Sequence, residues 1–249
     1  MSASPGGPGL ISRVAVIVAM QEEAAPLIEH LKLVRSEGIA GAPTIVHSGS
    51  YKGGTVSVVN PGRDEKTGVN LIGTDAAALT TFLAIKELLP DLVVTAGTCG
   101  GFKRAGGKVG DVYLATAFQH HDRRIPIPGY DAFGLGRRDA AKSSKLAEKL
   151  GFKTGLCSTG NSLDFIKDDD LRMADAVVKD MEGAAVAWAA DLAGNVPVLG
   201  IKVVTDLVDG GKPTQDEFLA NLSAASHSLQ DALPRVLDAI IMNDLDSLQ

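Results

Sequence analysis

The chain has 249 residues, and its 24 Lys and Arg against 30 Asp and Glu give a net charge of −6. A hydrophobic content of 45% and a charged content of 22% exclude a disordered or fibrous protein. The negative balance offers no basic field to a phosphate backbone, so we expect no nucleic-acid partner. No apolar stretch reaches the roughly 20 residues of a membrane-spanning helix, so we expect no membrane association.

The first twelve residues, MSASPGGPGLIS, are rich in Pro, Gly and Ser and lack the basic start and apolar core of a signal peptide. We expect 1–12 to be a disordered leader and 13–249 to form a single domain. Two cysteines, Cys99 and Cys157, are too few for a disulfide framework and indicate a reducing compartment. The sequence therefore predicts a cytoplasmic protein.

The first half of the chain alternates predicted strands and helices. The apolar, β-branched run 13–20 predicts a strand buried on both faces, and a helix is expected over 21–34. Residues 43–62 predict an antiparallel hairpin around a Lys-Gly-Gly turn. Apolar residues at helical spacing over 68–89 predict a helix that ends at the following proline.

The second half continues this alternation. Thr214 is expected to cap the last helix, with Glu217 completing a capping box. Strands are expected over 91–101, 107–118 and 196–207, and helices over 144–151, from about residue 182 to 193, and over 214–242. This order predicts an α/β fold, a three-layer αβα sandwich around a β-sheet that the hairpin makes mixed.

Acidic residues follow several of the predicted strands. Ligands of such folds bind beyond the carboxyl ends of the strands, where AMQEE (19–23), NPGRD (60–64), AGTCGG (96–101) and VTDLVD (204–209) place polar or glycine-rich sequence. Glu182 adds a carboxylate at the start of an apolar helix. Such a Glu can simply stabilise the positive end of the helix dipole, or it can bind a ligand. The residues alone favour the first interpretation for Glu182, and each acid at a strand end is by itself most often a solvated loop residue.

The glycine-rich turn GTCGG (97–101) matches neither the dinucleotide fingerprint nor the P-loop, which removes support for NAD and NTP binding. It is either a tight turn or a place where a ligand approaches backbone N–H groups, and the residues favour neither. Cys99 has no recognisable base beside it in the sequence. A small buried thiol is therefore favoured over a nucleophile.

The segment HHDRRIPIPGYDAFGLG (120–136) begins with two adjacent histidines. Neighbouring residues of a strand point in opposite directions, and no H-E-x-x-H or cysteine partner is present, so a metal site is disfavoured. A loop that covers a pocket or meets a second subunit is the favoured interpretation. Tyr130 and Phe133 would supply its apolar area.

Four segments, VVTAGTCGGF, VGDVYLATAFQHHDRRIPIP, KDMEGAAVA and VVTDLVDGGKPTQDEFL, resemble the 5′-methylthioadenosine nucleosidases of the nucleoside phosphorylase superfamily, most of all their plant-type branch. The resemblance runs in order over about 13–245. It implies a homodimeric hydrolase that cleaves 5′-methylthioadenosine to adenine and 5-methylthioribose, a step of methionine salvage, without metal or organic cofactor. It leaves open whether S-adenosylhomocysteine is also a substrate.

The resemblance also implies roles for individual residues. Glu23 matches the acid that helps to activate a water molecule, and Asp206 matches the acid that protonates the purine. Glu182 matches the residue that binds the ribose hydroxyls. Met181 would lie against the ribose, and Thr98 would line the same side of the pocket.

The chain departs from the family pattern at three positions. Leu163 stands where other branches place an aromatic residue against the base, and Asn161 stands where an Asp is expected. Lys202, counted here among the substrate-binding residues, stands where bacterial relatives carry Arg. The expected subunit interface comprises a helix over 66–73 and the loop around Phe133, which would close the neighbour's thioalkyl pocket.

The chemistry agrees with these assignments. Breaking an N-glycosidic bond builds positive charge on the sugar and negative charge on the departing purine, so the site needs an acid near the base and acceptors near the sugar. Asp206 requires a raised pKa to donate a proton near neutral pH. Two alternatives stay open: a phosphorylase in which Arg63 binds phosphate, and a non-catalytic binding protein, which the presence of all three acids disfavours.

Overall fold

The computed structural model describes residues 9–249, in which strands alternate with helices. The strands are β1 (Arg13–Ile17), β2 (Val34–Arg35), β3 (Ile45–Tyr51), β4 (Gly54–Asn60), β5 (Leu92–Gly101), β6 (Val112–His120), β7 (Arg138–Asp139), β8 (Lys153–Thr159), β9 (Ala176–Asp180) and β10 (Val198–Leu207). The helices are α1 (Gln21–His30), α2 (Thr74–Leu88), α3 (Tyr130–Leu135), α4 (Ser144–Leu150), α5 (Lys167–Asp170), α6 (Gly183–Leu192) and α7 (Thr214–Ile240). Short 3-10 turns lie at Lys103–Ala105, Leu171–Met173 and Leu245–Leu248.

The strands of the described chain form one mixed sheet. The pairs β1–β4, β1–β5, β5–β10, β6–β8 and β8–β9 are parallel, whereas β3 pairs antiparallel with β4 and β2. The predicted hairpin is therefore confirmed. Because β10 pairs with both β5 and β6, and β9 pairs with β5, the strands β5, β10, β6, β8 and β9 close into a ring.

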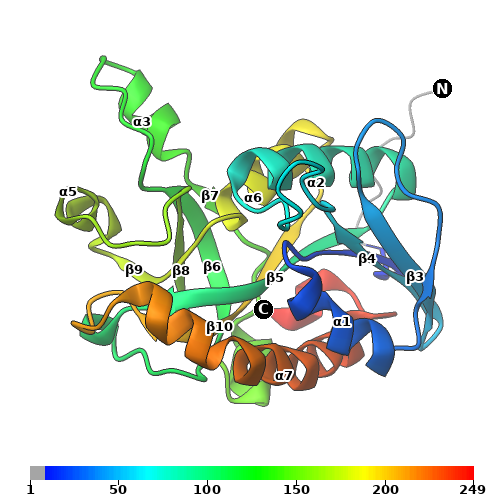
Figure 1. Cartoon of the computed structure of the whole chain (residues 1–249). Helices are drawn as coiled ribbons and strands as arrows, with labels where there is room; N and C mark the ends of the chain where they lie inside the picture. Colours follow the sequence, from blue (N-terminus) through cyan, green and yellow to red (C-terminus); the bar gives the residue numbers. More distant parts are fainter. Residues whose placement is uncertain (1–8) are drawn as a thin grey trace.

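Helices cover both faces of the sheet (Figure 1). On one face α1 and α7 bury a core that includes Leu27 and Leu233, and on the other α2 and α6 bury a second core that includes Ile85 and Val186. Both cores consist mainly of aliphatic side chains removed from water, and this burial is the main driving force for the layering. The predicted α/β fold with a mixed sheet is confirmed. None of the helices within residues 9–249 combines the length and the apolarity that crossing a membrane requires.

The predicted leader needs a correction at its end. Residues 1–8 lie outside the described residues, but Ile11 is buried in the core under α7 and its N–H donates to the carbonyl of Asn243. The N–H and hydroxyl of Ser12 both donate to Asp91. The folded chain thus begins before the predicted boundary, because Ile11 supplies apolar area that the core uses.

The predicted helix over 66–73 is wrong, since this stretch is a loop and α2 begins only at Thr74. Gly73 has a φ of 92°, which a helix cannot contain. Arg63 and Asn70 form an isolated β-bridge that holds the loop together. Backbone pairing across the loop therefore overrides the helical spacing of its apolar residues.

The predicted capping box of α7 is also wrong. Pro213 occupies the N-cap position and Thr214 is the first helical residue, without a capping hydrogen bond. The carboxylate of Glu217 instead accepts a hydrogen bond of 3.1 Å from the N–H of Leu207 at the end of β10. A tertiary donor thus takes the carboxylate that the local pattern assigned to the helix start.

Candidate active site

A cavity of about 640 Å³ opens at the carboxyl ends of β10, β5, β1 and β4, which lie side by side because these strands are parallel neighbours. This is where ligands of α/β folds bind. The predicted site residues that line it are Glu23, Thr98, Leu163, Met181, Glu182, Lys202 and Asp206. The structure thus brings together all predicted site residues except Phe133.

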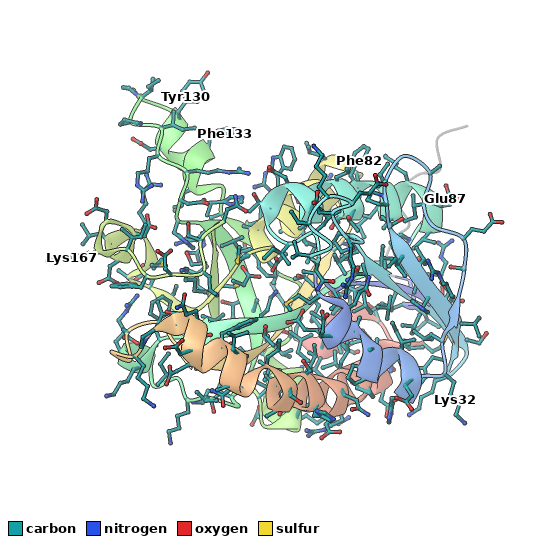
Figure 2. The ribbon with its side chains drawn as sticks, viewed as in Figure 1. Lys32, Phe82, Glu87, Tyr130, Phe133 and Lys167 are labelled. Atoms are coloured by element: carbon teal, nitrogen blue, oxygen red, sulfur yellow. The ribbon has the colours of Figure 1, made fainter. Side chains whose placement is uncertain are left out.

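Phe133 lies on α3, which projects from the body of the molecule with Tyr130 and Phe133 at its exposed end (Figure 2). Its side chain is 59% exposed, and its ring meets the Tyr130 ring edge-on with centroids 6.3 Å apart. The segment around it does not cover the pocket of its own chain. The first role expected for this segment, covering the pocket of its own chain, therefore does not fit its position.

Glu23 stands in the first turn of α1, directly after β1, and is 4% exposed. Its Oε1 accepts hydrogen bonds from the N–H and the hydroxyl of Thr98, at 2.7 and 2.6 Å. Burial raises the pKa of this carboxyl, and the hydrogen bonds from Thr98 partly offset the rise. One carboxylate oxygen is therefore fixed on Thr98, and the side chain lines the pocket.

Asp206 lies on β10 just after a bulge, a feature that re-aims side chains near active sites. Its Oδ1 accepts a hydrogen bond of 2.7 Å from the hydroxyl of Thr205, whereas its buried Oδ2 has no protein partner among the described residues. Burial raises the pKa of the carboxyl. Asp206 thus holds a proton more readily than an ordinary aspartate, and one of its oxygens is left without a protein partner among the described residues.

The glycines of the turn GTCGG make room for these acids. A Cβ built on Gly100 would lie 2.9 Å from Oδ2 of Asp206, and one on Gly97 would lie 3.3 Å from Oε2 of Glu23. The turn lies within β5 itself, so it is no tight strand-to-helix turn. Because the backbone at Gly97 and Gly100 comes this close to the carboxyl groups, little room is left for a side chain at either position.

Glu182 is the N-cap residue of α6 and is half-buried in the pocket wall. Its Oε1 accepts a hydrogen bond of 2.9 Å from the N–H of Gly73. Removal from bulk water, followed by the charge of nearby Asp180, raises the pKa of Glu182 to about 7. The first interpretation of this acid, a simple partner of the helix dipole, does not account for its contact with a distant loop.

We expect a Glu182→Gln variant to be more stable than the wild type at pH 8 by on the order of 2 kcal/mol, because it removes a charge that the native pocket disfavours. The native pKa lies above the ordinary value of 4.5. Between pH 4.5 and about 7 the native state therefore binds more protons than the unfolded state. The unfolding free energy of the wild type falls as the pH rises through this range. Urea unfolding at pH 5, 6, 7 and 8 measures the difference, which should shrink towards pH 5. A Glu65→Gln variant is the exposed control, and a difference independent of pH would contradict the prediction.

Lys202 lines the pocket, but its positive charge is paired with Asp180. Its Nζ lies 2.7 Å from Oδ2 of Asp180, and both side chains are almost fully buried. Asp180 also accepts hydrogen bonds from the hydroxyl of Thr159 and the N–H of Gly183, at 2.6 and 2.8 Å. Burial acts to lower the pKa of Lys202, but the Asp180 carboxylate outweighs it and the pKa is raised. Lys202 thus supports the floor of the pocket beside Glu182.

Asn161 joins three segments at the pocket edge. Its Oδ1 accepts from the N–H of Thr74 and its Nδ2 donates to the Thr74 hydroxyl, both at 2.8 Å. Its own N–H donates to Asp122 at 2.8 Å. The residue before Thr74 is Gly73, which holds Glu182. Asn161 therefore fixes the start of α2 next to Glu182.

An Asn161→Ala variant is expected to lose about 1 kcal/mol of unfolding free energy, because the N–H of Thr74 loses its acceptor. Asn161→Asp should retain most of this stability, since a carboxylate accepts from both the N–H and the hydroxyl of Thr74. Thermal or urea unfolding of the three proteins checks the expectation. Equal losses in the two variants would show that the hydrogen bonds between the Asn161 side chain and Thr74 do not stabilise the start of α2.

Two basic residues at the pocket, Lys179 and Arg63, make contacts that were not predicted. Lys179 is 6% exposed and its Nζ donates to the carbonyls of Leu163 and Asp164. Arg63 pairs with Glu22, with 3.2 Å between Nη2 and Oε1. Every lysine and arginine that lines the pocket in the described chain is therefore engaged by another protein group.

The remaining candidates are buried and uncharged. Cys99 and Cys157 are free thiols, and burial raises the pKa of both, as expected for unreactive core cysteines. His120 and His121 are fully buried, and burial lowers the pKa of each to about 4. Within residues 9–249, no three His, Cys, Asp or Glu side chains group closely enough to hold a metal ion.

The α/β fold and its pocket of carboxyl groups at the strand ends, together with a comparison with known protein families, define the class to which the chain belongs. Residues 13–238 match the family model of the Phosphorylase superfamily, and the chain therefore belongs to that superfamily. Within it, the chain is a member of the 5′-methylthioadenosine nucleosidases, as its motifs predicted. It is 44% identical over 243 residues to the 5′-methylthioadenosine nucleosidase of Arabidopsis thaliana, covering 96% of this chain and 91% of that protein.

A second Arabidopsis thaliana relative, a 5′-methylthioadenosine/S-adenosylhomocysteine nucleosidase, is 44% identical over 235 residues, covering 92% of each chain. The solved apo structure of the Arabidopsis thaliana 5′-methylthioadenosine nucleosidase superposes with a TM-score of 0.93 at 43% identity, covering 96% of this chain and 100% of that one. Sequence and fold thus agree over nearly the whole described chain.

Proposed function

We propose that the protein hydrolyses the N-glycosidic bond of 5′-methylthioadenosine to adenine and 5-methylthioribose. The observation that carries this proposal is the set of three carboxyl groups, Asp206, Glu182 and Glu23, on one pocket. The names of the Arabidopsis relatives support it. An acid for the base and acceptors for the sugar are the groups that this reaction needs.

In the proposed mechanism, Asp206 donates its proton to the purine as the bond from base to sugar breaks and the bonding electrons leave with the base. Glu182 accepts hydrogen bonds from the ribose hydroxyls. Glu23, held on Thr98, orients a water molecule and takes one of its protons as the oxygen bonds to the anomeric carbon. Met181 and Leu163 both line the pocket, and in this mechanism Met181 lies against the sugar and Leu163 against the base.

Water is favoured over phosphate as the nucleophile. A phosphate beside the sugar would face the carboxyl groups of Glu23 and Glu182 and be repelled by them when they are ionised. Arg63, the cation that a phosphorylase would use, is already paired with Glu22 and also donates to the carbonyl of Gly68. The charge arrangement therefore supports hydrolysis.

Product analysis tests the proposal. The purified protein is incubated with 5′-methylthioadenosine, with and without phosphate, and the products are separated by chromatography. Adenine and free 5-methylthioribose at a rate independent of phosphate are expected. Phosphate-dependent formation of the sugar 1-phosphate would support the phosphorylase alternative, and no adenine under either condition would support a binding protein.

We also propose that the protein acts as a homodimer. The exposed apolar side chains of Ile127, Tyr130 and Phe133 on the projecting segment support this, because such area is usually covered by a partner. If Phe133 closes the neighbour's thioalkyl pocket, Phe133→Ala should raise KM for 5′-methylthioadenosine about tenfold with a smaller change in kcat. Steady-state kinetics checks this, and an unchanged KM would contradict it.

A single folded domain in the cytoplasm completes the proposal. The two cores share one sheet, which supports a single domain from Ile11 onward. The two free, buried cysteines fit a reducing compartment. Cell fractionation with an antibody to the protein tests the location.

A further inference from the structure

The order of the parallel strands gives the pocket a direction. Asp206 belongs to β10, Thr98 to the adjacent β5, Glu23 follows β1, and Arg63 follows β4. Neighbouring strands are about 4.8 Å apart, so β4, which leads to Arg63, lies three strand steps, about 14 Å, from β10, which carries Asp206. In the proposed mechanism the base lies at Asp206 and the sugar at Thr98 and Glu23, which directs the 5′ substituent towards Arg63.

A charged pair stands at that end of the pocket. Arg63 and Glu22 both line the cavity, with side chains about half exposed, at 47% and 48%. Asn70 donates from Nδ2 to Oε2 of Glu22 at 2.8 Å, and its Oδ1 accepts from the N–H of Gln21. The guanidinium and the carboxylate are thus held side by side, facing the same opening.

We propose that Arg63 and Glu22 bind the α-amino acid end of substrates whose 5′ sulfur bears an amino-acid tail, as in S-adenosylhomocysteine. This inference rests on the proposed function. The tail ends in one carboxylate and one ammonium group, the charge complement of one arginine and one glutamate. Binding exchanges the pair between Arg63 and Glu22 for two new pairs, Arg63 with the tail carboxylate and Glu22 with the tail ammonium, so no charge is left unpaired.

The same exchange does not admit phosphate. Phosphate brings no cation, so taking Arg63 would leave Glu22 without its partner, close to Glu23. An exposed pair contributes little to stability, and its opening by a zwitterion is therefore inexpensive. The methylthio group of 5′-methylthioadenosine is too short and too apolar to engage either residue.

The test compares four substrates with wild type, Arg63→Met and Glu22→Gln by release of adenine. The substrates are 5′-methylthioadenosine, S-adenosylhomocysteine, its analogue without the amino group and its analogue without the carboxyl group. Arg63→Met should lower kcat/KM for the two carboxylate-bearing substrates at least tenfold relative to 5′-methylthioadenosine. Glu22→Gln should do the same for the two substrates that bear an ammonium group.

Arg13→Met is the matched control, because Arg13 forms a similar exposed pair with Asp91 at the opposite end of β1. The kcat/KM values of this variant for the four substrates, each relative to that for 5′-methylthioadenosine, should equal those of the wild type. Equal losses for all four substrates in Arg63→Met, or cleavage of 5′-methylthioadenosine but not of S-adenosylhomocysteine by the wild type, would overturn the inference and leave the proposed function standing. A wild type that releases no adenine from 5′-methylthioadenosine would instead overturn the proposed function.

Discussion

An Asp206→Asn variant is expected to lose at least a hundredfold in kcat towards 5′-methylthioadenosine, with a much smaller change in KM. General acid catalysis contributes about 10²–10⁴ to the rate, and an amide cannot donate the proton. The side-chain amide oxygen of this variant can still accept the hydrogen bond from Thr205, so the pocket should keep its shape. The loss therefore falls on the chemical step.

Steady-state kinetics over a range of pH measures this effect. Because burial raises the pKa of Asp206, the wild type retains the proton at higher pH than an ordinary aspartate, and kcat should fall as pH rises through that pKa. The residual activity of Asp206→Asn should lack this step. Asp216→Asn, at an exposed position in the first turn of α7, is the control. Full activity in Asp206→Asn would refute the proposed acid.

Replacing Lys202 with Met is expected to lower the unfolding free energy by about 3–5 kcal/mol, the usual result of removing one partner of a buried ion pair. The carboxylate of Asp180 would stay buried with only the hydrogen bonds from Thr159 and Gly183. The same loss should push the pKa of Glu182 further up, because Lys202 opposes its rise.

Urea unfolding at pH 7 of the wild type, Lys202→Met and Lys202→Met/Asp180→Asn checks this expectation. The double variant removes the unpaired charge and should recover part of the loss. Lys52→Met, which breaks an exposed pair with Asp238, should cost less than about 1 kcal/mol. A Lys202→Met protein as stable as the wild type would mean that the buried pair contributes nothing.

The sequence predicted those parts of the fold that local patterns encode. The buried strands corresponding to β1, β5 and β10 are runs of β-branched and apolar residues, and the β3–β4 hairpin follows from its turn residues. It missed β8 and β9, whose sequences KTGLCST and AVVKD mix polar and apolar residues without a clear period. These strands exist because they pair with each other and with β6 and β5.

The motifs in the sequence, through their resemblance to the nucleosidase family, indicated which acids to expect in the site, whereas the strand ends alone left this open, and the fold brings these three acids to one pocket. Only the tertiary structure decided how they are held. It paired Lys202 in the pocket wall with Asp180, turned Glu217 to the backbone of β10 instead of its own helix start, and paired Arg63 with Glu22. Each of these pairs forms because the folded chain brings the two groups close together and, for Lys202 and Asp180, removes them from water. The periodicity of residues along the sequence carries no information about that distance or that burial.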